Sequence, residues 1–129
     1  MPGTSLRVMI VDDSPTIRKT GEKILLEAGC EVMLAEDGFD CITKIKDFNP
    51  GLLFVDVMMP KLDGYKVTEL IRAHPELKSS PVIMLSSKDG LFDKAKGMAA
   101  GATDYLAKPF DREDLIEAIR KHVPSFTNS

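Results

Sequence analysis

Short apolar runs alternate with longer amphipathic segments along the whole chain. The apolar runs are rich in strand-forming residues and predict five strands, at residues 6–11, 31–35, 52–55, 81–85 and 103–106. Three of the five are almost wholly apolar, as expected of parallel strands that helices cover on both faces. The alternation therefore predicts βα units arranged around a parallel sheet.

The segments between the strands have the spacing and the end signals of helices. Ser14 and Pro15 start the first helix, and Gly29 ends it. The second is predicted at residues 39–48 and the third at about 64–73. The apolar positions expected to share the core-facing side of the first two are Ile17, Gly21, Ile24, Leu25 and Ala28, and Cys41, Ile42, Ile45 and Phe48.

Two further helices follow the fourth and fifth strands. One is predicted to end at Gly101, and the other to run from an Asp111 cap to Pro124, with acidic residues in its first turn and basic residues in its last. Their apolar stripes are Leu91, Ala95, Met98 and Ala99 in the first, and Leu115, Ile119 and Val123 in the second.

Five strands and five helices in strict alternation predict a doubly wound α/β fold of the flavodoxin-like type. Its five-stranded parallel sheet commonly has the order 2-1-3-4-5. We expect one domain at residues 6–123, with short tails at 1–5 and 124–129. In such a fold, ligands bind outside the carboxyl ends of the strands.

Composition narrows the choice of function. The chain has 129 residues, 43% of them hydrophobic, and its net charge of −3 argues against direct binding to nucleic acid. Cys30 and Cys41 form no metal-binding pattern and indicate reduced cytosolic thiols. The first residues lack the features of a signal peptide, and no apolar run could cross a bilayer. We expect a cytoplasmic protein without membrane insertion.

Polar residues stand at the carboxyl ends of the predicted strands. Asp12 and Asp13 follow the first strand, Asp56 the third, Ser86 the fourth and Lys108 the fifth. If they converge, three carboxylates at roughly 5 Å would repel by on the order of 3 kcal/mol per pair. A hard divalent cation offsets this repulsion best, and a few carboxylates with room for water and phosphate oxygens suit Mg²⁺. No other cofactor is expected.

Asp56 ends the central strand, where a nucleophile would meet both the cation and Lys108. A carboxylate nucleophile that forms an aspartyl phosphate is established chemistry. Mg²⁺, Lys108 and the Ser86 hydroxyl would neutralise the charge on the transferred group. Each motif is commonplace alone, since Asp12-Asp13-Ser14 could simply cap a helix, and the argument rests on their combination.

The span from about Leu6 to Val123 resembles the receiver domains of two-component response regulators, the CheY-like family. The matching motifs are Val11-Asp12-Asp13-Ser14, Asp56-Val57-Met58-Met59-Pro60 with Asp63-Gly64, Ser86, and Lys108-Pro109-Phe110. The resemblance implies that a histidine kinase phosphorylates Asp56. It also implies that Asp12, Asp13, Asp56 and the Met58 carbonyl hold Mg²⁺, that Ser86 and Tyr105 form a switch pair, and that the Lys108-Pro109 bond is cis.

Residues 80–97, with the ending at 122–126, resemble one branch of that family, the receivers of twitching-motility control. This implies a chemotaxis-type histidine kinase as phosphodonor and an effector in type IV pilus control. The family's output face is the fourth helix, fifth strand and fifth helix. Because no DNA-binding segment follows in the sequence given, we expect output through a partner protein, from a monomer or weak dimer.

The protein is not expected to act as an enzyme on other substrates, only to catalyse its own phosphotransfer and slow self-dephosphorylation. In this family, the residues two beyond the acceptor and two beyond the switch hydroxyl flank the attacking water. Here these are Met58 and Lys88, and neither side chain can orient a water as a carboxylate or amide does.

Three other functions are compatible with a fold of this type. A flavodoxin-like FMN binder needs a phosphate-cradling loop after the first strand, where this chain has two aspartates. A phosphatase acting on external substrates usually needs a lid, for which 129 residues leave no room. A receiver could also serve as a phosphate sink or relay intermediate, and the sequence does not separate these roles from direct output.

Overall fold

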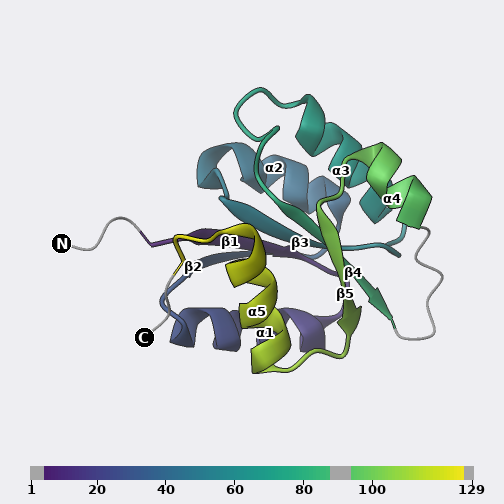
Figure 1. The fold of residues 1–129 in the computed structure, drawn as a ribbon. Helices are drawn as coiled ribbons and strands as arrows, with labels where there is room; N and C mark the ends of the chain where they lie inside the picture. The colour runs from purple at the N-terminus through teal and green to yellow at the C-terminus, as the bar shows by residue number, and fades with distance from the viewer. Residues whose placement is uncertain (1–4, 88–93, 127–129) are drawn as a thin grey trace.

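The computed structural model describes residues 5–87 and 94–126, which form a five-stranded parallel sheet. Its strands are β1 (Arg7–Val11), β2 (Glu31–Ala35), β3 (Leu52–Asp56), β4 (Val82–Ser87) and β5 (Asp104–Lys108). They are hydrogen bonded in the order β2-β1-β3-β4-β5, and every neighbouring pair is parallel. The predicted doubly wound sheet is confirmed (Figure 1).

Helices cover both faces of the sheet. They are α1 (Pro15–Glu27), α2 (Gly38–Phe48), α3 (Gly64–Ala73), α4 (Lys94–Ala100) and α5 (Arg112–His122). Figure 1 shows α1 and α5 on one face and α2, α3 and α4 on the other. Because side chains alternate along a strand, Met9 and Ile10 of β1 enter different buried clusters, one on each face.

The helix ends follow the predicted signals. Ser14 Oγ accepts a hydrogen bond from the Ile17 amide at 3.3 Å at the start of α1, and Gly29 beyond its end has φ +90°. Asp111 and Asp114 form a reciprocal capping box at the start of α5. These local signals determine where α1 and α5 begin and where α1 ends.

Strands β4 and β5 are longer than predicted. Ser86 pairs with Ala107, and Ser87 pairs with Lys108, so the ladder continues two residues beyond the predicted strand ends. The reason is that polar residues at the end of a buried strand still form backbone hydrogen bonds. Ser86 and Lys108 are consequently held by the sheet rather than by loops.

The apolar stripe predicted for the fourth helix is wrong. Ala95, Met98 and Ala99 are exposed, Met98 to 67%, whereas Gly97 and Ala100 are buried. The short helix packs inward through its smallest residues, a choice that hydrophobic periodicity cannot reveal. Leu91 lies outside the described residues. Ile42 of α2 is likewise 43% exposed, at the edge of the face predicted to be buried.

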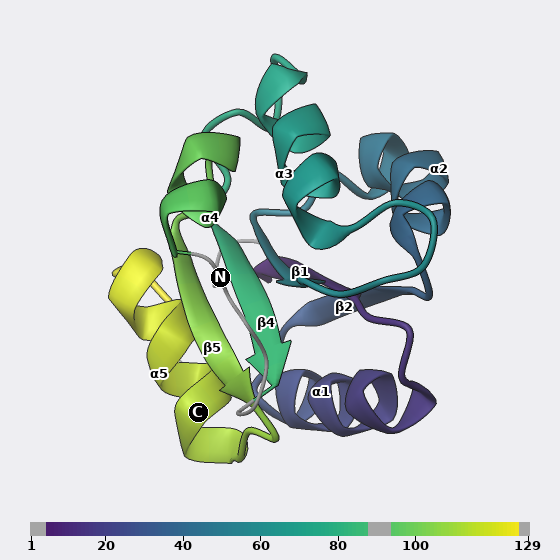
Figure 2. The same cartoon turned by 90° about the vertical axis from the view of Figure 1, so that its right-hand side faces the viewer.

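Figure 2 shows β5 at the edge of the sheet, between α4 and α5. Tyr105 on this strand is 50% exposed. Cys30 and Cys41 are buried free cysteines, and they lie in different clusters, one on each face of the sheet. Among the described helices, none has the length and apolar character needed to cross a membrane.

Candidate functional site

The candidate site lies at the carboxyl ends of β1, β3, β4 and β5. The connections from β1 and β3 lead to opposite faces of the sheet, which is where doubly wound folds form their binding crevice. A cavity opens at this edge, and the polar or exposed residues that line it are Asp13, Asp56, Met58, Ser86, Ser87 and Lys108. Residues far apart in the sequence thus share one pocket.

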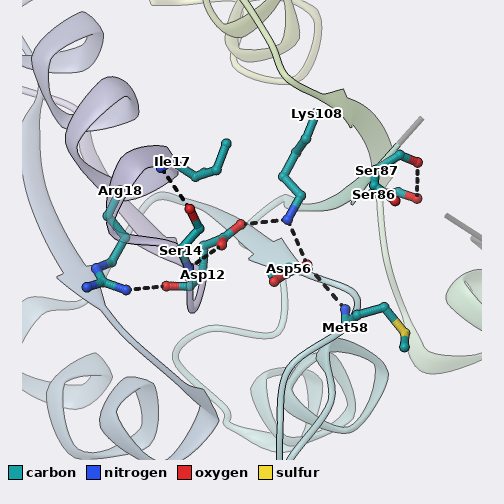
Figure 3. A network of polar contacts seen from close by, with 9 residues as sticks. All are labelled: Asp12, Ser14, Ile17, Arg18, Asp56, Met58, Ser86, Ser87 and Lys108. Carbon is teal, nitrogen blue, oxygen red and sulfur yellow. Dashed lines mark hydrogen bonds and ion pairs between the residues drawn. The ribbon is translucent and has the colours of Figure 1, made fainter. Parts of the chain in front are cut away.

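The three aspartates lie close together. Asp12, Asp13 and Asp56 each offer a carboxylate oxygen within 4.8 Å of the others. Asp12 is fully buried, Asp56 is 3% exposed, and Asp13 is exposed at the mouth. Lys108 Nζ lies 3.1 Å from Asp12 Oδ2 and 3.1 Å from Asp56 Oδ1, as Figure 3 shows. One ammonium therefore bridges two buried carboxylates.

The site has an excess of negative charge, because Lys108 alone cannot offset three carboxylates. Burial and the charge of Asp12 raise the pKa of Asp56 to about 6, although Lys108 acts in the opposite direction. Burial lowers the pKa of Lys108, but Asp12 and Asp56 outweigh it and raise that pKa. An added cation would favour the charged form of Asp56. The donors are all oxygens, which fits a hard divalent ion.

Backbone contacts hold the carboxylates in place. The Ser14 amide donates to Asp12 Oδ1 at 2.9 Å, and the Met58 amide donates to Asp56 Oδ1 at 3.2 Å. The Gly64 amide donates to the Val57 carbonyl at 3.0 Å and brings the start of α3 against the end of β3. The peptide bond between Lys108 and Pro109 is cis, as the resemblance implied.

Ser86 and Tyr105 are placed differently. Ser86 is 6% exposed, and its hydroxyl donates to the Ser87 carbonyl at 3.3 Å rather than to Asp56. Tyr105 pairs in register with Met84, two residues before Ser86, so both side chains are on the face of the sheet that α4 covers. Met58 is 73% exposed at the cavity edge, and Lys88 lies outside the described residues.

Two residues help to position the site in a way that the sequence did not predict. Arg18 on α1 bonds the backbone of Asp12, and Gly64 approaches the backbone of Asp56. Asp63-Gly64 was noted as a motif, but only the structure shows that a Cβ at position 64 would lie 2.2 Å from the Asp56 carbonyl oxygen. No pattern in the sequence marks a side chain that bonds a backbone carbonyl.

Comparison with known proteins relates most of the chain to one family. The model of the response regulator receiver domain matches residues 8–120. Protein PilG of Pseudomonas aeruginosa is 58% identical over 122 residues, which are 95% of this chain and 90% of that protein. Response regulator MprA of Mycobacterium bovis is 36% identical over 90% of this chain. The match covers 50% of the length of MprA.

Solved structures agree with the fold. The Vibrio cholerae chemotaxis protein CheY4 has a TM-score of 0.89 and 32% identity, over 93% of this chain and 100% of that chain. The receiver domain of a Pseudomonas aeruginosa sensor histidine kinase has a TM-score of 0.84 and 30% identity, over 95% of this chain and 100% of that one. That receiver was crystallised with a magnesium ion coordinated in its active-site cleft.

Proposed function

This chain belongs to the response regulator receiver domain family, and we propose that it is a phosphorylation switch whose Asp56 accepts a phosphoryl group from a histidine kinase with Mg²⁺ as cofactor. The observation that carries the proposal is the bridge from Lys108 to both Asp12 and Asp56 at 3.1 Å. The positive charge of Lys108 therefore lies beside Asp56, the buried carboxylate that ends the central strand.

Each residue has a role in this proposal. Asp12, Asp13, Asp56 and the Met58 carbonyl would hold Mg²⁺, which when bound supplies charge neutralisation for the phosphoryl oxygens. An Asp56 oxygen attacks phosphorus, and a new O–P bond forms as the N–P bond to the kinase histidine breaks and the electron pair leaves with that nitrogen. Lys108 contacts the transferred group, and Ser86 turns its hydroxyl toward it as a donor.

The proposal is tested with a small phosphodonor such as acetyl phosphate. Wild-type protein should gain an acid-labile phosphoryl group in Mg²⁺ and none in excess chelator. Asp56→Asn keeps the shape of the side chain but removes the nucleophilic charge, so it should gain none in either condition. Labelling of the Asn variant, or of the wild type in chelator, would refute the site.

The signal would leave through the face formed by α4, β5 and α5. Negative charge on Asp56 draws the Ser86 hydroxyl inward, and the Tyr105 ring then moves from its exposed position to the inside. The partner must bind this face and favour the inward state, since a ligand shifts an equilibrium only by its differential affinity. Tyr105 and Met98 are exposed here, which supports the proposal.

The kinship with PilG and the resemblance to twitching-motility receivers support a role in type IV pilus control. The phosphodonor would be a chemotaxis-type histidine kinase, and the protein would act in the cytoplasm as a monomer or weak dimer. Beyond its own phosphotransfer and slow dephosphorylation, it would catalyse no reaction. A pull-down with phosphorylated and unphosphorylated protein should recover the effector only in the phosphorylated state. Equal recovery would contradict phosphorylation-dependent output.

A further inference from the structure

Arg18, in the first turns of α1, reaches back to the acidic loop that precedes this helix. Its Nη1 donates a hydrogen bond to the backbone carbonyl oxygen of Asp12 at 2.7 Å, as Figure 3 shows. Arg18 is not among the residues that line the cavity. Its guanidinium is therefore directed at the backbone behind the site rather than at a phosphoryl group inside it.

The other polar groups of Asp12 already have partners. Its amide donates to the Ala35 carbonyl at 3.1 Å, Oδ1 accepts from Ser14, and Oδ2 contacts Lys108. The carbonyl is the group that remains, at the point where β1 ends and the chain turns toward α1. Arg18 fixes this group, and its own amide donates to the Ser14 carbonyl at 3.1 Å. Backbone and side chain of Arg18 thus tie the loop to the helix at two points.

We propose that Arg18 is a positioning residue for the cation site: by holding the Asp12 carbonyl, it keeps the carboxylates of Asp12 and Asp13 in the geometry that binds Mg²⁺. The inference rests on the proposed function. Groups that orient the ligands of a metal typically contribute about 10- to 100-fold to its affinity. Arg18 is not among the residues that line the cavity, so it would act on the ion through Asp12.

A general effect of charge would have the opposite sign. Removing a positive side chain near an acidic site makes the site more negative and tightens Mg²⁺ binding. Loss of the contact that positions Asp12 would instead weaken Mg²⁺ binding. The direction of the change in Mg²⁺ affinity therefore separates the two effects, and Lys19 offers a matched control, since it is an exposed cation on the same helix.

The experiment measures Mg²⁺ binding by titration calorimetry without phosphodonor, for the wild type, Arg18→Met, Arg18→Lys and Lys19→Met. Arg18→Met should weaken Mg²⁺ binding about 10-fold. Arg18→Lys, which keeps one charged donor, should recover part of the loss, and Lys19→Met should leave affinity unchanged or slightly tighter. Urea unfolding of each variant identifies any that is not folded. If Arg18→Met does not fold, Arg18→Lys must still bind Mg²⁺ more weakly than the wild type.

In a second arm, acetyl phosphate labels each folded variant over a range of Mg²⁺ concentrations. Arg18→Met should need about 10-fold more Mg²⁺ for half-maximal rate and approach the wild-type rate at saturation. Unchanged or tighter Mg²⁺ binding in Arg18→Met would overturn the inference about Arg18. Absence of Mg²⁺ binding in the wild type would instead overturn the proposed function.

Discussion

Gly64 approaches the phosphoacceptor backbone more closely than a residue with a side chain could. A Cβ at this position would lie 2.2 Å from the Asp56 carbonyl oxygen and 2.9 Å from its carbonyl carbon, and neither backbone atom can move aside cheaply. Gly64→Ala should therefore lower the free energy of unfolding in urea by about 1–3 kcal/mol and slow labelling of Asp56.

Gly51→Ala is the matched control for Gly64. A Cβ there would meet the flexible end of Leu6 at 3.0 Å, and the nearest backbone atom is 3.7 Å away. This variant should lose much less stability and keep the wild-type rate of labelling. If the two alanine variants were equally stable, the close approach at Gly64 would not constrain Asp56 as argued.

Met58 should determine how long the phosphoryl group survives. Its side chain is 73% exposed at the edge of the cavity and cannot orient an attacking water. Replacing Met58 by Asn, together with Lys88→Glu, supplies an amide and a carboxylate and should shorten the lifetime measured by loss of acid-labile phosphate after donor removal. An unchanged or longer lifetime would show that these positions do not control hydrolysis.

Among the elements, α5 and α2 present contrasting surfaces for testing output. Arg120 is 47% exposed on α5, and Lys46 is exposed in the last turn of α2. Arg120→Glu should weaken binding of the phosphorylated protein to its effector roughly tenfold, about 1.4 kcal/mol, because it reverses a charge on the proposed output face. Lys46→Glu should have little effect, and both variants should be phosphorylated normally.

Lys121→Glu and Lys44→Glu test the same two helices with less precision. Lys121 lies 3.3 Å from Asp104, and Lys44 lies 3.0 Å from Asp40, so each change breaks an ion pair that is shorter than the 4.0 Å contact of Arg120 with Glu117. Binding measured by calorimetry with all four variants decides the face. Loss of binding in the α2 variants and not in the α5 variants would rule out the proposed output surface.

The start of β5 is tied to the end of α5 through Asp104. His122 Nε2 lies 2.7 Å from Asp104 Oδ2, whose side chain is 24% exposed. Burial raises the pKa of Asp104, but His122, the Tyr105 amide and Lys121 outweigh it and lower that pKa below its ordinary 3.8. The carboxylate therefore stabilises the fold above pH 3.8, and this contribution is lost as pH falls through the lowered value.

Asp104→Asn should accordingly lower the free energy of unfolding by about 1 kcal/mol at pH 7. The difference from wild type should begin to shrink as pH falls below 3.8 and should vanish below the lowered pKa of Asp104, where that carboxyl is as neutral as the Asn amide. Urea unfolding at a series of pH values measures it, with Asp47→Asn, an exposed carboxylate on α2, as the control. A difference that is constant with pH would contradict an electrostatic role for Asp104.

At the scale of the whole molecule, the sheet order and the meeting of Asp12, Asp56 and Lys108 could be predicted from the sequence. Each of them ends or follows a strand, and parallel strands in a known order bring those ends to one edge. Their spacing depends only on backbone geometry, which a strand pattern specifies well.

Two features could not be predicted, for different physical reasons. The inward face of α4 consists of Gly97 and Ala100, and small residues give hydrophobic periodicity nothing to detect. The bond from Arg18 to the Asp12 carbonyl joins a side chain to a backbone atom, and every residue has that atom. Contacts of this kind depend on the path of the chain and are seen only in three dimensions.

The central claim is that Asp56 is the phosphoacceptor. Borohydride reduces an aspartyl phosphate to homoserine, so peptide mass spectrometry after phosphorylation and reduction identifies the modified position directly. Protein incubated with acetyl phosphate and Mg²⁺ should contain homoserine at position 56 and at no other aspartate. Homoserine at position 12 or 13, or none at 56 while the protein carries acid-labile phosphate, would contradict the account.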